Sequence, residues 1–472
     1  MHKINNLIEK ASRHLPYIYL LYIIPLVCFT AIQTPPFQNP DEPNHFMRAE
    51  QFSRLEILPG FVNQKPGKTD TISNNPEILY PTPGGFKADK GIIEAYGYIS
   101  DVSFHPTVKV NKLQLDSAKQ IRWGSGMTLS NFANTAIYPP VGYVMPVIGI
   151  WIGKALNLTV IQTLYISRLL NSLLVITICF FALLFARQCN KLMFIVLLFP
   201  MTIALFASVS QDSILISSAF LLISIIDNAE FTVKPKYSHW QIAAIAVLMT
   251  VIGLTKPPYA LLAFVFLFLS ITPKQKAVII GVPFIFVATW LYFIHPNFSV
   301  IFAPGWLHIN TKLQVAHILQ HPLKFAAMFF KISPSGIVAN TKMFIGVLGW
   351  LDLSFPHIYY ILAFIILIIG FIINGKFKNK DHTYVRVALL ISAFITIIAI
   401  ITVQYITWAP LDSPSLAGMA GRYLLPVFPF VALAVSSNKK TTSMKNILLF
   451  LILIFPLITA SFLIQGILFR YY

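Results

Sequence analysis

Residues 17–50 read YIYLLYIIPLVCFTAI-QTPPFQ-NPDEPNHFMRAE, an apolar run that ends at Ile32 and is followed closely by two adjacent carboxylates. Apolar runs of about 20 residues cross a bilayer as helices. No small-residue cleavage site follows this run, so we interpret it as a retained span and not as a signal peptide. Asp41, Glu42 and His45 are therefore expected at a membrane surface.

The composition extends this interpretation to the whole chain. Hydrophobic residues make up 56% of the 472 residues and charged residues only 11%, with a mean hydropathy of +0.70. The alternating pattern of a membrane barrel is absent, and helices are the other structure that crosses a bilayer. The sequence therefore predicts an all-α polytopic membrane protein, a single membrane domain over residues 1–472.

The positive charges predict the orientation of that domain. The net charge is +18, but Lys and Arg lie mostly between spans, which favours the lipid bilayer as the partner and argues against nucleic acid. Alternate connections are rich in these residues, and the short connections on the opposite side, apart from Lys256, contain few. The N-terminus is then cytoplasmic and the C-terminus outside. Eleven spans are expected, at residues 17–32, 164–186, 192–209, 213–229, 240–254, 259–272, 277–294, 357–374, 384–404, 422–436 and 446–466.

Two large segments are expected on the outward side. Residues 33–163 include an amphipathic stretch after the first span and two alternating stretches, 91–104 and 107–116, which predict a small β-insert. Residues 138–158 either form a further span or lie in, or re-enter, the outer interface. We favour the interface because of their three prolines. The second outward segment, residues 295–356, contains an amphipathic helix around 312–331.

Asp41 and Glu42 have two interpretations. In the first, Glu42 is the N-cap of a helix with Pro43 at its first position, and Phe46, Ala49 and Phe52 form its buried face. In the second, one carboxylate is a general base, because a carboxylate pair beside apolar surface provides the chemistry for proton abstraction. The residues themselves leave both interpretations open.

Four further ionisable residues lie at the outward ends of other expected spans, namely Arg168, Asp212, Lys256 and Arg422. Each alone is explained as a snorkelling or topology residue. Together at one face they favour a site, because charge at a span end is costly unless it is paired. Three cations near two carboxylates indicate an anionic ligand such as a phosphate or diphosphate.

Other residue types near this face add candidates. Aromatic side chains at the outward boundaries fit an interfacial belt, and some are suited to stacking on a sugar. They are Tyr138, Tyr143, Tyr259, Trp306, Trp350, Trp408 and Tyr423. His45 and Arg48 follow Glu42 on the same expected helix. We include His45, Arg48, Tyr138 and Tyr423 among the candidate substrate-binding residues. No second histidine stands at metal-ligand spacing, and the three cysteines form no framework.

Several segments occur in the order typical of one family. They are PPFQNPDEPNHFMRAEQFS, YPPVGYVMP, SRLLNSLL, SVSQDSILIS, TKPPYALLA, GVLGWLDLSFP and GRYLLPVFP. Across nearly its whole length the chain resembles the bacterial predicted-membrane-protein family called domain of unknown function 2142. That family is similar to the GT-C glycosyltransferases, which use polyprenyl-phosphate-linked sugars and carry an acidic motif in the first outward loop.

The resemblance implies a function and roles for the candidate residues. The protein would be an inverting glycosyltransferase of the bacterial inner membrane, passing a sugar from a polyprenyl-phosphate donor to a glycan or lipid-linked acceptor on the outward face. Asp41 or Glu42 would be the base, with Asp41 preferred, and Asp212 would lie at the rim. Arg168, Lys256 and Arg422 would hold the phosphate.

Two other functions compete with glycosyl transfer. One is a non-catalytic flippase or transporter of polyprenyl-linked glycans, which should carry charges along its spans and often has internal repeats. The other is a polymerase, for which arginine-rich outward loops are expected. No cofactor is implied with certainty, although Asp41, Glu42 and Asp212 are candidates to hold a divalent cation.

Overall fold

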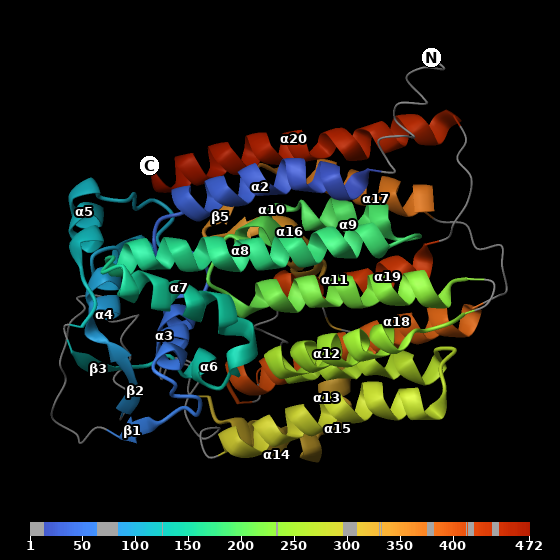
Figure 1. Cartoon of the computed structure of the whole chain (residues 1–472), viewed down its shortest axis with the longest axis horizontal. Helices are drawn as coiled ribbons and strands as arrows, with labels where there is room; N and C mark the ends of the chain where they lie inside the picture. The colour runs from blue at the N-terminus through green and yellow to red at the C-terminus, as the bar shows by residue number, and fades with distance from the viewer. Residues whose placement is uncertain are drawn as a thin grey trace.

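The computed structural model describes residues 14–63, 84–124, 126–232, 235–295, 309–329, 331, 333–374, 382–411, 413, 420–436 and 443–472. Long apolar helices run side by side through most of it (Figure 1). They are α2 (Leu15–Gln33), α8 (Val160–Phe185), α11 (Gln211–Glu230), α12 (His239–Thr255), α13 (Pro273–Ile294), α17 (His357–Asn374), α18 (Thr383–Trp408) and α20 (Ser443–Tyr471).

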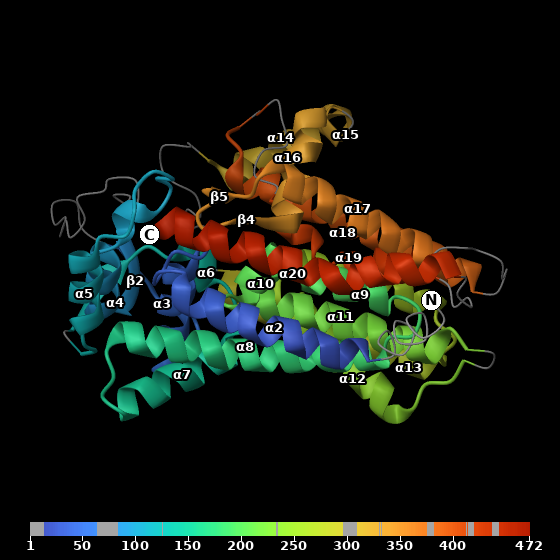
Figure 2. The same ribbon diagram turned by 90° about the horizontal axis from the view of Figure 1, so that it is seen from above.

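Shorter elements connect and cover these helices. The α-helices are α3 (Glu42–Ser53), α4 (Lys90–Gly97), α5 (Lys112–Gln120), α6 (Ala133–Ala136), α7 (Val144–Ala155), α9 (Asn190–Leu197), α10 (Pro200–Phe206), α14 (Thr311–Gln320), α15 (Pro322–Phe329), α16 (Pro334–Gly346) and α19 (Phe428–Val435). The 3-10 helices are η1 (Ser100–Val102), η2 (Pro140–Tyr143), η3 (Pro257–Phe268) and η6 (Gly421–Leu424). In Figure 2, α14 and α15 stand out at one side of the bundle.

The expected count of eleven spans is only partly supported. Six described helices are long and apolar enough to cross a membrane: Leu15–Gln33, Val160–Phe185, Gln211–Glu230, Pro273–Ile294, Thr383–Trp408 and Asn446–Tyr471. Four shorter apolar helices are Pro140–Ala155, His239–Thr255, Pro257–Phe268 and His357–Ile373. The molecule is therefore a mostly helical protein of multi-pass membrane type, as the composition predicts.

The expected spans at 192–209 and 422–436 are interrupted. The first divides into α9 and α10, because Pro200 cannot continue a helix and leaves Phe199 in extended backbone. Irregular backbone at membrane depth is tolerated where protein covers it, and both Leu198 and Phe199 are fully buried. The second begins as η6 and becomes α-helical only at Phe428.

Helix α11 forms the centre of the bundle. Nearly all of its residues are buried, including polar ones such as Ser224, whose hydroxyl donates to the Phe220 carbonyl one turn earlier. It packs against α8, α12 and α19. Helix α13 lies at the periphery and exposes Phe284, Ile285 and Tyr292, side chains suited to contact with lipid.

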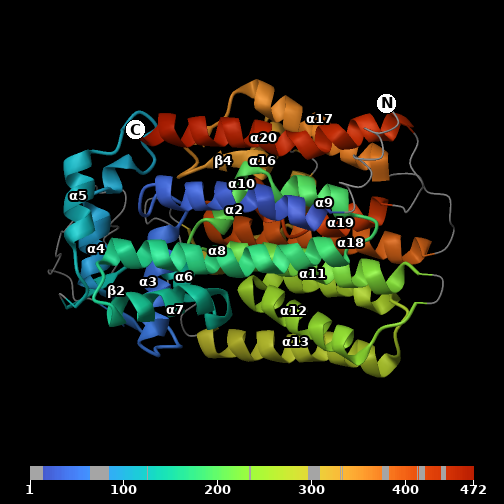
Figure 3. The same ribbon diagram turned by 45° about the horizontal axis from the view of Figure 1, so that its top comes forward.

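The described elements between α2 and α8 lie toward one end of the bundle (Figure 3). Its sheet has the order β1-β2-β3, from β1 (Phe61–Asn63), β2 (Gly84–Asp89) and β3 (Met127–Ser130), all antiparallel, with Phe61 opposite Phe86 and Phe86 opposite Ser130. A second pair joins β4 (Val347–Leu348) and β5 (Leu353–Ser354). A small β-insert thus exists, but the two alternating stretches predicted to form it, 91–104 and 107–116, instead contribute α4, η1 and the start of α5.

Residues 138–158 form η2 and α7. Helix α7 has 12 residues, about 18 Å of rise, too short to cross a bilayer. It runs antiparallel to the start of α8, since Gly149 lies against Ser167 and Gly153 against Thr163. Helix α7 is therefore too short to form an additional span by itself.

Candidate functional site

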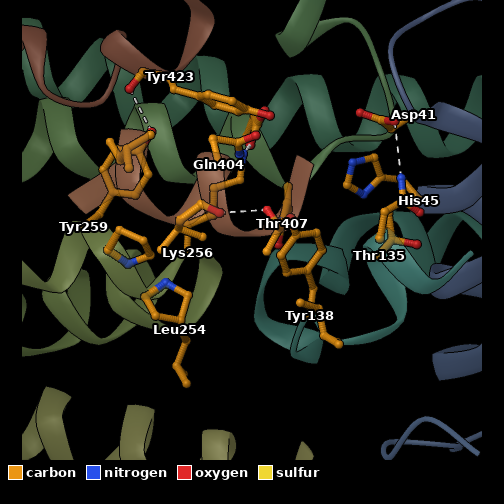
Figure 4. A pocket seen from close by; sticks show the side chains of 18 of the residues that line it. Asp41, His45, Thr135, Tyr138, Leu254, Lys256, Tyr259, Gln404, Thr407 and Tyr423 are labelled. Carbon is orange, nitrogen blue, oxygen red and sulfur yellow. Dashed lines mark hydrogen bonds and ion pairs between the residues drawn. The ribbon is translucent and has the colours of Figure 1, made fainter. Parts of the chain in front are cut away.

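A cavity of about 360 Å³ lies where α3, α11, α12, α13, α18 and η6 meet. Charged and amide side chains line part of it, and apolar side chains line the rest. The polar lining comes from Asp41, His45, Asn134, Thr135, Tyr138, Gln211, Asp212, Lys256, Tyr259, Gln404, Thr407, Arg422 and Tyr423, and the apolar lining includes Ile137, Leu254, Trp290, Leu291, Ile294, Ile400, Val403 and Trp408. Figure 4 shows Asp41 and His45 on one side and Lys256, Tyr259 and Tyr423 on the other.

Asp41 presents its carboxylate to this cavity. Its backbone is left-handed, with φ of 58°, and its side chain makes no capping hydrogen bond to α3 although it occupies the N-cap position. Oδ2 lies 3.1 Å from Nη2 of Arg422, and Oδ1 accepts a hydrogen bond from Nδ2 of Asn134 at 3.3 Å. Non-glycine residues in this conformation are uncommon and cluster at functional sites. The side chain is therefore available for a role other than capping.

Glu42 faces away from the cavity, and the prediction that it is the N-cap is wrong. It is the first residue of α3 and is fully buried. Its carboxylate pairs with Arg168 in a fork, with Nε to Oε1 at 2.8 Å and Nη2 to Oε2 at 2.5 Å, and it also accepts the backbone N–H of Val209 at 3.0 Å. Glu42 thus ties α3 to α8 and to the residues that precede α11.

Arg168 does not line the cavity either. Besides Glu42, its guanidinium donates to the carbonyl oxygens of Ala31, Thr34 and Pro35 at 2.7, 2.8 and 3.1 Å. These bonds hold the C-terminal end of α2, where helix carbonyls lack partners. Arg168 is thus used by contacts within the protein, and the structure does not bring it together with the other predicted phosphate-binding residues, Lys256 and Arg422, at the cavity.

The remaining charges of the site form an alternating row. Nζ of Lys256 lies 2.5 Å from Oδ1 of Asp212, and Oδ2 of Asp212 lies 3.9 Å from Nε of Arg422, which in turn contacts Asp41. Lys256 also lies over the ring of Tyr423, at 4.3 Å from its centroid. Two cations and two carboxylates balance one another, where the sequence predicted three cations.

His45 lines the cavity as a neutral group. Its Nδ1 is 2.7 Å from the hydroxyl of Tyr143, and its ring stacks on Tyr138 with centroids 6.2 Å apart. Burial lowers the pKa of His45 to about 4, with Lys256 and Arg422 acting in the same direction and the carboxylates of Asp41 and Asp212 opposing. At neutral pH this imidazole exchanges hydrogen bonds without adding positive charge.

Arg48, predicted to bind substrate, is not among the residues that line the cavity. Its guanidinium donates to the carbonyl oxygens of Tyr138 and Ile57 at 2.9 and 3.0 Å and to the side chain of Gln51, and it lies 4.0 Å above the centroid of the Phe52 ring. Burial lowers the pKa of Arg48 to about 9, so it remains protonated at neutral pH. It fixes the chain around Tyr138, which does line the site.

Some of the predicted aromatic residues line the cavity, and others lie outside it. Tyr138, Tyr259, Trp408 and Tyr423 line the cavity; the Tyr259 hydroxyl donates to the Tyr423 carbonyl at 2.7 Å. Trp350 donates instead to the Phe37 carbonyl outside it. Trp306 lies outside the described residues.

Sequence reasoning missed several polar lining residues. Gln404 and Thr407 stand inside the apolar helix α18, where a polar side chain is itself a signal of a buried site. Asn134 and Thr135 lie in the short helix α6, and its sequence carries no such signal. Gln211 was overlooked beside the charged Asp212.

The three proposed metal-binding carboxylates do not fit a cation site. Glu42 is committed to Arg168, and Asp41 and Asp212 are paired with cations. Within the described ranges no group of three or more His, Cys, Asp or Glu side chains is placed to hold a metal ion.

Comparison with known proteins gives one match. A family model described as predicted membrane protein (DUF2142) matches residues 25–431. No curated protein and no solved structure matches the chain.

Proposed function

The chain belongs to this family of predicted membrane proteins, and we propose that it is an inverting glycosyltransferase. It would transfer a sugar from a polyprenyl-phosphate-linked donor to a hydroxyl of a cell-surface glycan or lipid-linked acceptor, at the outward face of the bacterial inner membrane. The observation that carries this proposal concerns the carboxylate of Asp41. It makes no capping hydrogen bond to α3 and instead faces the cavity beside Arg422.

Asp41 is the proposed general base. It accepts the proton of the acceptor hydroxyl as the acceptor oxygen bonds to the anomeric carbon of the sugar. The bond from that carbon to the phosphate oxygen breaks at the same time, and its electron pair leaves with the phosphate. This single displacement inverts the configuration of the anomeric carbon. Glu42 has no place in the reaction, because Arg168 and Val209 occupy its carboxylate.

Lys256 and Arg422 are the proposed phosphate-binding groups. An arginine has five N–H donors and a lysine three, so contacts with Asp41 and Asp212 leave donors for a phosphate oxygen. Arginine also stays charged at neutral pH and matches phosphate geometry. The row is balanced before the donor binds, so the negative charge that develops on the leaving phosphate is met by cations already in position.

The apolar lining suits the lipid part of the donor. Ile400 and Val403 line the cavity together with Trp408 on the same helix. Eight residues of helix separate Ile400 from Trp408, about 12 Å of rise. The cavity thus reaches from the polar row along an apolar helix, which supports a ligand that has a charged head and a hydrocarbon chain.

The test is the variant Asp41→Asn in membranes supplied with a polyprenyl-phosphate sugar and an acceptor. Asparagine keeps the shape but accepts no proton, so transfer should fall by about 10² to 10⁴-fold. Asp116→Asn is the matched control, because Asp116 is exposed in the same outward segment and pairs only with Lys119 among the residues described. Equal rates of sugar transfer by Asp41→Asn and the wild type would refute the role of Asp41 as the general base.

The same preparation separates transfer from translocation. In sealed vesicles a flippase or transporter would move the lipid-linked glycan between leaflets without forming a new glycosidic bond. Movement without transfer, unaffected by Asp41→Asn, would replace the enzyme proposal by the transporter.

A further inference from the structure

Gln211 is a buried cavity-lining residue that the proposed reaction does not use. It is the first residue of α11, directly before Asp212, and its exposed fraction is 1%. Neither its amide nitrogen nor its amide oxygen has a hydrogen-bond partner among the residues that the structure describes. A buried carboxamide with two donors and an acceptor is rarely left so.

The neighbours of Gln211 at the start of α11, unlike Gln211 itself, have partners for their polar side chains. The Ser210 hydroxyl accepts the backbone N–H of Asp212 at 3.2 Å, and the Ser213 hydroxyl donates to the Ser210 carbonyl at 2.6 Å. Asp212 is paired with Lys256. Ser210, Asp212 and Ser213 thus each have a hydrogen bond or an ion pair, whereas the amide of Gln211 has neither among the described residues.

The position of Gln211 is also fixed from behind. Gly142 of η2 approaches so closely that a Cβ built there would lie 2.8 Å from Cβ of Gln211. The backbone on that side leaves little room for the side chain to withdraw. The unpaired amide is thus held at the cavity wall.

The amide chemistry selects the ligand group. A phosphate offers only acceptors, so it would leave the amide oxygen unpaired and beside negative charge. Two adjacent sugar hydroxyls offer a donor and an acceptor side by side, which matches a carboxamide. We propose that Gln211 recognises a pair of adjacent hydroxyls on the sugar bound in this cavity. This inference rests on the proposed function and adds to it the residue that selects the sugar.

The experiment measures binding of methyl glycosides to the purified full-length protein, without any transfer. Removing either recognised hydroxyl, in deoxy analogues, should weaken binding to the wild type by about tenfold. Gln211→Met keeps the size of the side chain and removes the amide, so it should bind the parent glycoside about tenfold more weakly and lose the discrimination. Gln465→Met is the matched control, since Gln465 is exposed on α20 and contacts Ser461.

A second variant guards against a folding defect. Gln211→Asn keeps the amide and retracts it from the cavity, so it should weaken binding in the same direction. Wild-type discrimination in Gln211→Met, or a wild type that binds no methyl glycoside, would overturn the inference. Glycoside binding that depends on Gln211 in a protein that never transfers sugar would refute the transferase and leave the recognition intact. The opposite result is also informative. If sugar transfer depends on Asp41 but Gln211→Met still distinguishes the parent glycoside from its deoxy analogues, the proposed role of Gln211 is refuted and the transferase proposal is not.

Discussion

At the scale of single residues, the adjacent carboxylates Asp41 and Glu42 belong to different parts of the molecule. Successive helical residues point about 100° apart, and the left-handed backbone of Asp41 turns its side chain further from the helix that Glu42 begins. Glu42 enters the protein interior and meets Arg168, while Asp41 faces the cavity. One carboxylate is paired in the interior, and the other lines the cavity and is the base in the proposed reaction.

This division predicts opposite effects of two conservative variants. Glu42→Gln leaves the buried guanidinium of Arg168 without its counter-charge, which should reduce the free energy of unfolding by about 3–5 kcal/mol and lower the melting temperature in detergent. Asp41→Asn should change the melting temperature much less, because the Asp41 side chain is 32% exposed.

The double variant Glu42→Gln/Arg168→Met is the control for the ion pair. It removes both charges together, so it should be less destabilised than the sum of its two single variants. Asp41→Asn melting as early as Glu42→Gln would show that the two carboxylates are not divided in this way.

At the scale of elements, the seam between α7 and α8 shapes the wall of the site. Gly149 and Gly153, four residues apart, face Ser167 and Thr163, a small-residue arrangement that allows two helices to approach closely. The seam places η2 beside α11, where Gly142 meets Gln211. The glycines of α7 thus help to position the cavity lining.

Gly153→Ala should therefore destabilise the protein. A Cβ at this position would lie 2.2 Å from Oγ1 of Thr163, and overpacking of this kind costs about 1–3 kcal/mol. Gly281→Ala in α13 is the matched control, since no described atom lies within 4 Å of its added Cβ. The melting temperature in detergent should fall for the first and not for the second. Equal melting temperatures of the two variants would show that α7 and α8 can accommodate the added methyl group without loss of stability.

At the scale of the whole molecule, the end of the last helix is bound to two segments that lie far from it in the sequence. The guanidinium of Arg470 in α20 donates to the carbonyl oxygens of Val102 and Val108 and pairs with Asp352 at 2.6 Å. These contacts join the last helix to both large segments that the sequence places outside. Figure 1 shows α2 starting and α20 ending at opposite ends of the bundle.

The charge distribution then predicts an outward C-terminus. Alkaline phosphatase fused after Tyr472 should be active, because this enzyme folds only outside the cytoplasm, and the same reporter fused after Lys236 should be inactive. The opposite pattern would reverse the proposed orientation and place the cavity at the cytoplasmic face.

The sequence by itself determined the class of the protein and much of its site. Apolar runs too long for a soluble domain require a membrane, and charges too costly to bury unpaired at span ends mark the face at which Asp41, Asp212, Lys256 and Arg422 meet. The short alternating stretches misled, because tertiary packing overrides weak local patterns.

Only the tertiary structure decided which charges are free to act. Glu42 and Arg168 are 126 residues apart and satisfy each other in the interior, and Arg48 is used by backbone carbonyls. The unpaired state of Gln211 likewise depends on what surrounds it. Residue type and position indicate that a polar group needs a partner, but the partner is chosen by contacts between distant segments, and these exist only once the chain has folded.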